Sequence, residues 1–395
     1  MSRRGELDAI VVGGGAIGAA LALGLARDGF DVALVEARAA KPWRAGDDVD
    51  LRVVALAADA RALFEDLGVW SGIAGARIGP YRRMRVWDAL APGELAFDAA
   101  ENGEAALGWI IENALIQHAL WTAIGAEPNV RLLCPAEVAS VENEDDGVTA
   151  TLADGTRLRA RVLVAADGAE SPLRKALGID CDNRDYLQRA VVANVATTRP
   201  HEDTAWQRFL PGGPLAFLPL ADGRSSIVWS LPNAEAARVL ALDDAAFRTE
   251  LGAAFDFRLG EIASSTPRAA FPLRLRLAKR YVAGRSVLAG DAAHVVHPLA
   301  GQGMNLGFRD VACLRRVLRE AGERGGDIGA AHVLRRYERE RRSENTMAAR
   351  GLDAIWHVFN SSNPAVSTAR GFGLATVDKT RFAKQFFASV AAGRM

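Results

Sequence analysis

Two glycine-rich segments, far apart in the chain, constrain its fold more than any other feature. Gly13–Gly18 follows the apolar run Ala9–Val12, and Gly290–Gly307 follows the apolar run Ser286–Ala289. In both places the order of residue types is that of a buried strand, a tight turn and a helix. Two such turns predict that the chain holds one long ligand at two points.

The first segment carries the spacing G-x-G-x-x-G in Gly13, Gly15 and Gly18. The first glycine allows a tight turn, the second lets the backbone approach a pyrophosphate, and the third permits close packing of a helix on a strand. Ala16 and Ile17 begin that helix, and the N–H groups at a helix N-terminus favour phosphate. The segment therefore predicts a nucleotide-binding turn.

Glu36 supports the same prediction from the next apolar run. It follows Phe30–Val35 at about the 20-residue spacing expected of a carboxylate that binds a ribose hydroxyl. A solvated strand end is the alternative explanation of this residue.

The second segment carries its own carboxylate. Gly290 and Asp291 follow an apolar run, and an aspartate at such a strand end can accept hydrogen bonds from ribitol or ribose hydroxyls. Pro298–Asn305 is predicted to turn and start a helix, whose N–H groups would face the electron-rich edge of a flavin ring. The residues concerned are Gly301, Gly303, Met304 and Asn305. A cofactor held at both ends indicates FAD, whereas a plain strand, turn and helix is the alternative.

Asp167 and Gly168 form a third, weaker signal after the buried run 162–166. A strand that ends in Asp-Gly is by itself more often a simple turn. The pair gains meaning only beside the two glycine-rich segments.

Charge and cysteine content exclude other classes of protein. The chain has 48 Lys and Arg against 48 Asp and Glu, so no global basic field suggests nucleic acid. Three cysteines without a close pair predict neither a disulfide framework nor a zinc site, and indicate a reducing, cytoplasmic compartment. His294 and His297 have no third ligand pattern, so no metal is expected. The first apolar run is broken by glycines, which disfavours a signal peptide.

The expected fold class is α/β, with a discontinuous Rossmann-like dinucleotide-binding domain, an antiparallel-sheet substrate domain and C-terminal helices. The first unit is β-α-β, and helical spacing predicts helices over Leu56–Leu67, Trp109–Ile124 and Val333–Arg350. Short runs predict strands over Arg131–Val162 and an antiparallel sheet over Tyr186–Phe271. The FAD-binding domain is assigned to residues 1–75, 100–180 and 272–345, the substrate domain to 76–99 and 181–271, and a helical tail to 346–395.

With these motifs in place, the chain resembles the class A flavoprotein aromatic hydroxylases, which share the para-hydroxybenzoate hydroxylase fold. The segment GRSVLAGDAAHVVHPLAGQGMNLGFRD resembles more closely the hydroxylases of ubiquinone biosynthesis. Further matching segments are DLRVVALAADARALFEDLGVW, IIENALIQHALW, ADGAESPLRKALGI and FPLRLRLAKRYVAGR. The likeness extends from Asp8 to about Arg350 and more weakly into the tail.

The resemblance implies roles for several residues. It places Arg52 near the pyrophosphate or the flavin, and Asn113 or Gln117 near the pyrophosphate. It places Asp167 where FAD and a pyridine nucleotide meet, and Asp291 on the ribityl chain. A surface arginine and exposed helix polarity are the alternatives for the first three. Pro298 would line the flavin ring, and His297 and Pro298 are the candidate catalytic residues.

The implied reaction is hydroxylation of a polyprenylated phenol or quinol by dioxygen through a flavin hydroperoxide, with NAD(P)H as the reductant. A flavin hydroxylase of a small soluble aromatic and a non-catalytic flavin-binding subunit are the alternatives. Trp229 is a candidate wall of the substrate pocket, with ordinary core packing as the alternative. The tail aromatics predict either packing or docking to a ubiquinone-biosynthesis complex or to the inner membrane surface; they are Trp356, Phe359, Phe382, Phe386 and Phe387.

Overall fold

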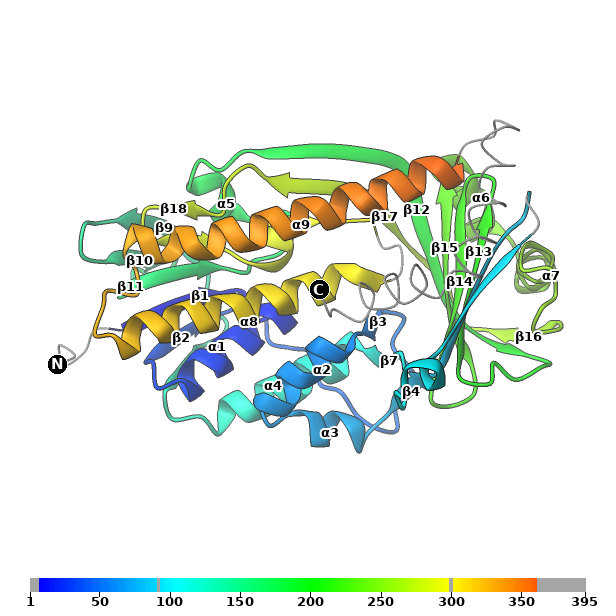
Figure 1. Cartoon of the computed structure of the whole chain (residues 1–395), viewed down its shortest axis with the longest axis horizontal. Helices are drawn as coiled ribbons and strands as arrows, with labels where there is room; N and C mark the ends of the chain where they lie inside the picture. Colours follow the sequence, from blue (N-terminus) through cyan, green and yellow to red (C-terminus); the bar gives the residue numbers. More distant parts are fainter. Residues whose placement is uncertain (1–6, 91–92, 298–300, 361–395) are drawn as a thin grey trace.

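The computed structural model describes residues 7–90, 93–297 and 301–360 (Figure 1). Its first sheet has a parallel core in the strand order β19-β11-β1-β2-β8. The bounds are β1 Leu7–Val12, β2 Val32–Val35, β8 Val130–Leu133, β11 Arg157–Ala165 and β19 Ser286–Leu288. The antiparallel strands β9 (Val138–Asn143), β10 (Val148–Leu152) and β18 (Val282–Ala283) extend it.

Three helices cover the parallel core because their small and apolar residues allow close approach. Helix α1 (Ala16–Arg27) is buried over nearly its whole length and packs between α4 (Asn113–Gly125) and α8 (Gln302–Glu323). Strand β1, helix α1 and strand β2 form the β-α-β unit that the sequence predicts, with β1 and β2 parallel. A strand buried on both faces explains the continuous apolar run Ala9–Val12.

The second sheet is almost entirely antiparallel, in the order β20-β17-β12-β15-β14-β13-β5-β6, with β16 paired to β12. Among the described strands of this sheet, only β13 and β5 run parallel to each other. The bounds are β5 Arg83–Asp88, β6 Glu94–Asp98, β12 Cys181–Thr197, β13 Thr204–Leu210, β14 Gly213–Pro219, β15 Ser225–Pro232, β16 Ile262–Ser265, β17 Ala269–Ala278 and β20 His294–Val295. Helices α6 (Asn233–Ala241) and α7 (Asp244–Ala254) accompany it, and Phe247 of α7 joins the core on one face.

A small sheet of β3 (Val53–Leu56), β7 (Gly108–Glu112) and β4 (Ile78–Tyr81) completes the described part of the chain. The predicted helix over Trp109–Ile124 is therefore wrong at its start, because residues up to Glu112 pair with β3 and β4 as strand β7. Periodicity does not separate a short buried strand from a helix that directly follows it. The shorter helices are α2 Ala58–Asp66, α3 Trp70–Ala74, η1 Ala99–Asn102, α5 Pro172–Ala176 and η2 Gly290–Ala292.

Helix α9 (Ala331–Asn360) lies along both main sheets (Figure 1). Tyr337 near its beginning belongs to the core of the parallel sheet, whereas Trp356 and Phe359 near its end pack on the second sheet. The helix is longer than the predicted Val333–Arg350 and is continuous through residue 345, where the tail was expected to begin. The domain ranges stay a prediction, and Phe382, Phe386 and Phe387 lie outside the described residues.

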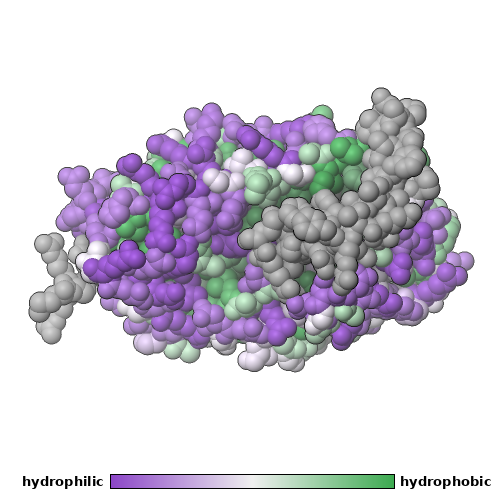
Figure 2. All heavy atoms as spheres, in the orientation of Figure 1, coloured by the Kyte–Doolittle hydropathy of each residue, from purple (hydrophilic) through white to green (hydrophobic). Residues whose placement is uncertain are grey.

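The face seen in Figure 2 is mostly hydrophilic, with hydrophobic side chains gathered near the end of α9. Ile355 and Val358 of that helix end are exposed. Within the described ranges, no helix is both long and apolar enough to cross a membrane.

Candidate active site

The predicted site residues converge because they follow the carboxyl ends of neighbouring parallel strands. Gly13 follows β1, Glu36 follows β2, Asp167 lies two residues after β11, and Gly290 comes shortly after β19. In an open parallel sheet the crevice outside these ends is where ligands bind.

The first glycine turn has no room for side chains at two positions. A Cβ on Gly13, whose φ is +105°, would lie 2.3 Å from the Ala166 carbonyl oxygen. A Cβ on Gly18 would lie 1.8 Å from the Gly13 carbonyl oxygen. Gly15 is the opposite case, since it is exposed and nothing lies within 4 Å of its Cβ position. The turn is thus closed toward the protein and open at Gly15, as a phosphate cradle requires.

Side chains bind both the N–H group and the carbonyl oxygen of Gly14. Its N–H donates to the Glu36 carboxylate, and its carbonyl oxygen accepts from Gln117 Nε2 at 2.9 Å and from Trp121 Nε1 at 2.8 Å. The Gln117 amide, expected near a pyrophosphate, is therefore used to hold the turn. Trp121 was not anticipated, although its place one helical turn after Gln117 was visible in the sequence.

The second glycine turn is anchored by a buried carboxylate. Gly290, with a φ of +61°, donates its N–H to Asp310 Oδ2 at 3.0 Å. The same carboxylate contacts His294 Nε2 at 2.6 Å and accepts from Arg341 Nε at 2.8 Å and Asn345 Nδ2 at 3.1 Å. Burial would raise the pKa of Asp310, but His294 and Arg341 outweigh that effect and lower it to about 2. His294 thus helps to hold Asp310, which anchors the second glycine turn. The described residues contain no group of three potential metal ligands.

Asp291 faces a cavity together with Arg52 and Asn113. Enclosure by the surrounding protein raises the pKa of Asp291, and the charges of His294 and Arg52 oppose that rise. The side chain still has exposed surface inside this concave region. Asn113 N–H donates to the Arg52 carbonyl oxygen at 2.9 Å, so the two residues are joined through the backbone.

Glu112 was missed by sequence reasoning although it precedes Asn113 directly. This buried carboxylate accepts from Trp43 Nε1 at 3.2 Å, from Arg77 Nε at 2.9 Å and from the Asp50 N–H at 2.9 Å. Glu112 therefore fixes the segment that precedes Arg52 by accepting hydrogen bonds from Trp43 and Asp50.

Asp167 is engaged within its own turn. Its carboxylate accepts from Ser171 Oγ at 2.5 Å and from the Leu173 N–H at 3.0 Å, and burial raises its pKa. The nearby Arg174 is buried and donates to the carbonyl oxygens of Ala292 at 2.8 Å and Ala169 at 3.0 Å. Arg174 thereby links the Asp167-Gly168 turn to the second glycine turn.

Helix α8 begins at the cavity. Gly301 is its N-cap with a φ of +64°, and residues 301–304 line the cavity. The Asn305 side chain donates to the Ala55 carbonyl oxygen at 2.9 Å and accepts from the Ala57 N–H at 3.0 Å. Asn305 therefore joins α8 to β3, and the first turn of α8 lies at the cavity. Pro298 lies outside the described residues.

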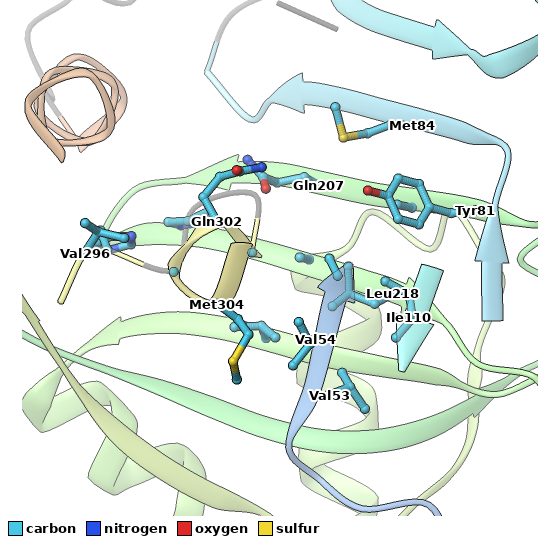
Figure 3. A pocket seen from close by; sticks show the side chains of 18 of the residues that line it. Val53, Val54, Tyr81, Met84, Ile110, Gln207, Leu218, Val296, Gln302 and Met304 are labelled. Atoms are coloured by element: carbon cyan, nitrogen blue, oxygen red, sulfur yellow. The ribbon is translucent and has the colours of Figure 1, made fainter. Parts of the chain in front are cut away.

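The cavity has a volume of about 400 Å³ and is walled by β3, β4, β7 and one face of the second sheet (Figure 3). Most lining side chains are apolar, among them Val53, Val54, Met84, Ile110, Leu218 and Met304. Of the two expectations for Trp229, core packing is correct and the wall role is not. Strand β15 alternates, so Val228 and Ser230 face the cavity while Trp229 packs with Phe247 and Phe255 on the opposite face.

These residues fit a flavin dinucleotide. The open cradle at Gly15 and the carboxylate of Glu36 suit the nucleotide half, and Asp291 with the start of α8 suits the flavin half. An apolar cavity of this size next to the flavin half suits a ring-shaped substrate. Fold and site together define the class of flavin-dependent monooxygenases.

The comparisons identify the family within that class. The model of the FAD binding domain family matches residues 6–350, and the chain belongs to this family. It is 37% identical over 377 residues to 3-demethoxyubiquinol 3-hydroxylase of Escherichia coli, covering 95% of each chain. It is 37% identical to ubiquinone hydroxylase UbiL of Rhodospirillum rubrum, covering 98% of this chain and 90% of that protein. The resemblance drawn from the sequence is therefore confirmed, and FAD is the cofactor.

Solved structures confirm the fold. The p-nitrophenol 4-monooxygenase PnpA of Pseudomonas putida matches over the full length of both chains with a TM-score of 0.77 at 20% identity. HpxO of Klebsiella pneumoniae, complexed with FAD and uric acid, matches with a TM-score of 0.74 at 22% identity, covering 98% of this chain and 97% of that one. The predicted α/β class with an antiparallel second sheet is correct, whereas the individual cofactor contacts stay predictions.

Proposed function

We propose that this chain hydroxylates the aromatic ring of a polyprenylated phenol or quinol in ubiquinone biosynthesis, with dioxygen as the oxygen source and NAD(P)H as the reductant. Bound FAD, once reduced, activates dioxygen for transfer of one oxygen atom to an electron-rich ring. Relatives named as 3-demethoxyubiquinol and ubiquinone hydroxylases support the substrate class. The polarity of the cavity is the structural observation that carries the proposal.

Among the described residues that line the cavity, Arg52 and Asp291 are the charged ones, and the charge of Arg52 acts on Asp291. No second cation of this lining is available to hold a carboxylate on a substrate ring. A neutral ring with an apolar tail therefore fits better than a small aromatic acid, whose buried charge would need a partner.

The chain itself positions the reactants. The N–H groups at the start of α8 stabilise negative charge on the flavin ring, and Asp291 orients the ribityl chain. The apolar walls Val54, Ile110 and Leu218 exclude water and hold the substrate ring against the flavin half of the site.

Turnover of the purified, FAD-loaded protein tests the proposal. We expect a short-tailed 3-demethoxyubiquinol analogue to stimulate NADH or NADPH oxidation and to gain one oxygen atom, as measured by mass spectrometry. An aromatic acid is the comparison substrate, and preferential hydroxylation of the acid would favour the small-aromatic alternative. Flavin binding without product from either compound would favour the non-catalytic subunit.

We infer in addition that the protein works at the inner membrane surface or within a biosynthetic complex, because its substrate is lipid-soluble. The exposed Ile355 and Val358 beside the apolar end of α9 support this inference. Sedimentation with vesicles of inner-membrane lipids tests it. Replacing both residues by serine should reduce the bound fraction, and binding unchanged from the parent would exclude this surface.

A further inference from the structure

His297 is a buried polar side chain without a polar partner. It is 1% exposed and lines the cavity, and neither ring nitrogen has a hydrogen-bond partner among the described residues. Nearly all buried polar groups in folded proteins are paired, so an orphaned imidazole at a cavity wall indicates a partner supplied by a ligand.

The neighbours of His297 have their polar groups committed elsewhere. The Tyr186 ring contacts the imidazole edge-on, with the centroids 5.0 Å apart, but its hydroxyl donates to Asp353 at 3.0 Å. Asp353 also accepts from Arg184 Nη1 at 3.1 Å. Trp356 also packs on Tyr186 and donates to Gln188 at 2.9 Å. The Tyr186 ring packs against the imidazole without binding its nitrogens, so a ligand in the cavity is the polar partner that the site can supply.

The imidazole is neutral at physiological pH. Burial lowers the pKa of His297 to about 4, against the smaller opposing effect of Asp353. A neutral imidazole has one N–H donor and one nitrogen acceptor. The bare nitrogen can accept a hydrogen bond from a hydroxyl group, whereas a neutral ring carries no charge to balance a carboxylate.

We propose that His297 binds the ring hydroxyl of the substrate and thereby sets which ring carbon faces the flavin. The hydroxyl proton is donated to the imidazole nitrogen, which enriches the ring in electron density at the ortho and para carbons. The inference rests on the proposed substrate class and assigns to His297 the recognition of its oxygen.

Two ligands that differ in one hydroxyl test this contact directly. Binding of ortho-geranylphenol and geranylbenzene to the oxidised, FAD-loaded protein is measured by calorimetry and by the change in the flavin spectrum. We expect the wild type to prefer the phenol by at least about tenfold, or about 1.4 kcal/mol. His297→Phe should reduce that preference to about threefold or less, and His297→Gln, which keeps a donor and an acceptor, should restore part of it.

A histidine outside the cavity provides the matched control. His118 is exposed on α4, so His118→Phe should keep the wild-type preference. During turnover, His297→Phe should divert reductant to hydrogen peroxide without loss of FAD. If His297→Phe does not retain FAD, His297→Leu provides the same comparison.

Two outcomes would count against the inference and are distinguishable. An equal preference for the phenol in wild type and His297→Phe would overturn the role of His297 and leave the substrate class intact. Failure of the wild type to bind the phenol at all would overturn the proposed substrate class, and this inference with it.

Discussion

At the scale of single residues, buried polar side chains hold the backbone that forms the site. Gly14 is fixed at both ends by side chains, and Gly290 is anchored by Asp310. Asp291 differs from these residues because its carboxylate is presented to the cavity. The site therefore consists of a few groups that face the ligand and a larger set that orients them.

Replacing Asp291 by Ala should weaken FAD binding by about tenfold or more, because a carboxylate that accepts from the ribityl chain is lost. Titration of the apoprotein with FAD, followed by flavin fluorescence, measures the change. Asp180→Ala is the control, since this aspartate is exposed before β12. An unchanged dissociation constant in Asp291→Ala would refute the assigned role.

Asp310 should make the free energy of unfolding depend on pH in the acid range. Its folded-state pKa of about 2 lies below the ordinary value of 3.8, so its contribution is complete above about pH 4 and is lost as the pH falls toward 2. Asp310→Asn removes the buried charge partner of Arg341, which keeps only the half-exposed Glu344, and should destabilise the protein by about 3 kcal/mol at pH 7.

Urea unfolding of both proteins between pH 7 and pH 3 measures this dependence. The difference in the free energy of unfolding should be constant above about pH 4 and should shrink below it. A difference that stays constant throughout the acid range would show that the Asp310 charge does not carry the effect.

At the scale of elements, helix α4 holds the first glycine turn, Gly13–Gly18, through two side chains that donate to one carbonyl oxygen. Gln117 and Trp121 both donate to the Gly14 carbonyl oxygen. Helix α5 acts similarly, because Arg174 reaches the carbonyl oxygen of Ala292. Each glycine turn is thus held by a helix that is remote in sequence.

Gln117→Leu and Trp121→Phe should each weaken FAD binding by about twofold to fivefold, and together by more than the product of the two. The reason is that either donor alone still satisfies the shared carbonyl. Fluorescence titration of both single variants and the double variant measures the coupling, and Thr122→Val on the exposed side of α4 is the control. Strictly multiplicative effects would contradict a shared role.

The elements were partly predictable from the sequence, and the reasons are physical. The spacing of Gly13, Gly15 and Gly18 is compatible with few local structures other than a strand, a tight turn and a helix. The strand at Trp109–Glu112 was missed because its apolar run carries no period of its own. Trp121, Arg174 and Asp310 could not be assigned, because their partners lie at carbonyls and N–H groups that only the folded chain brings near.

At the scale of the whole molecule, α9 joins the two main sheets. At about 1.5 Å per residue its 30 residues span about 45 Å. Its beginning packs on the parallel sheet and its end on the second sheet, so unfolding of one sheet removes support from the other. We therefore expect a single cooperative transition for the folded protein.

A proline in the middle of α9 should break that cooperativity. Met347 is 63% exposed, so Met347→Pro removes a helical hydrogen bond at a cost of about 3 kcal/mol without deleting a buried side chain. Flavin fluorescence and tryptophan fluorescence should then report different unfolding midpoints, whereas they should coincide in the wild type and in Met347→Ala. Coincident midpoints in Met347→Pro would show that α9 does not couple the sheets.

The way α9 holds Asp310, the anchor of Gly290 on α8, also has a consequence for the order of events during synthesis. Asp310 acquires its partners Arg341 and Asn345 only after these residues have left the ribosome. The turn that carries Asp291 therefore matures late, when nearly the whole described chain has been translated. The proposed nucleotide half of the site lies early in the sequence and the residues that hold the Gly290 turn lie far later, so we expect tight FAD binding only after most of the described chain has been translated.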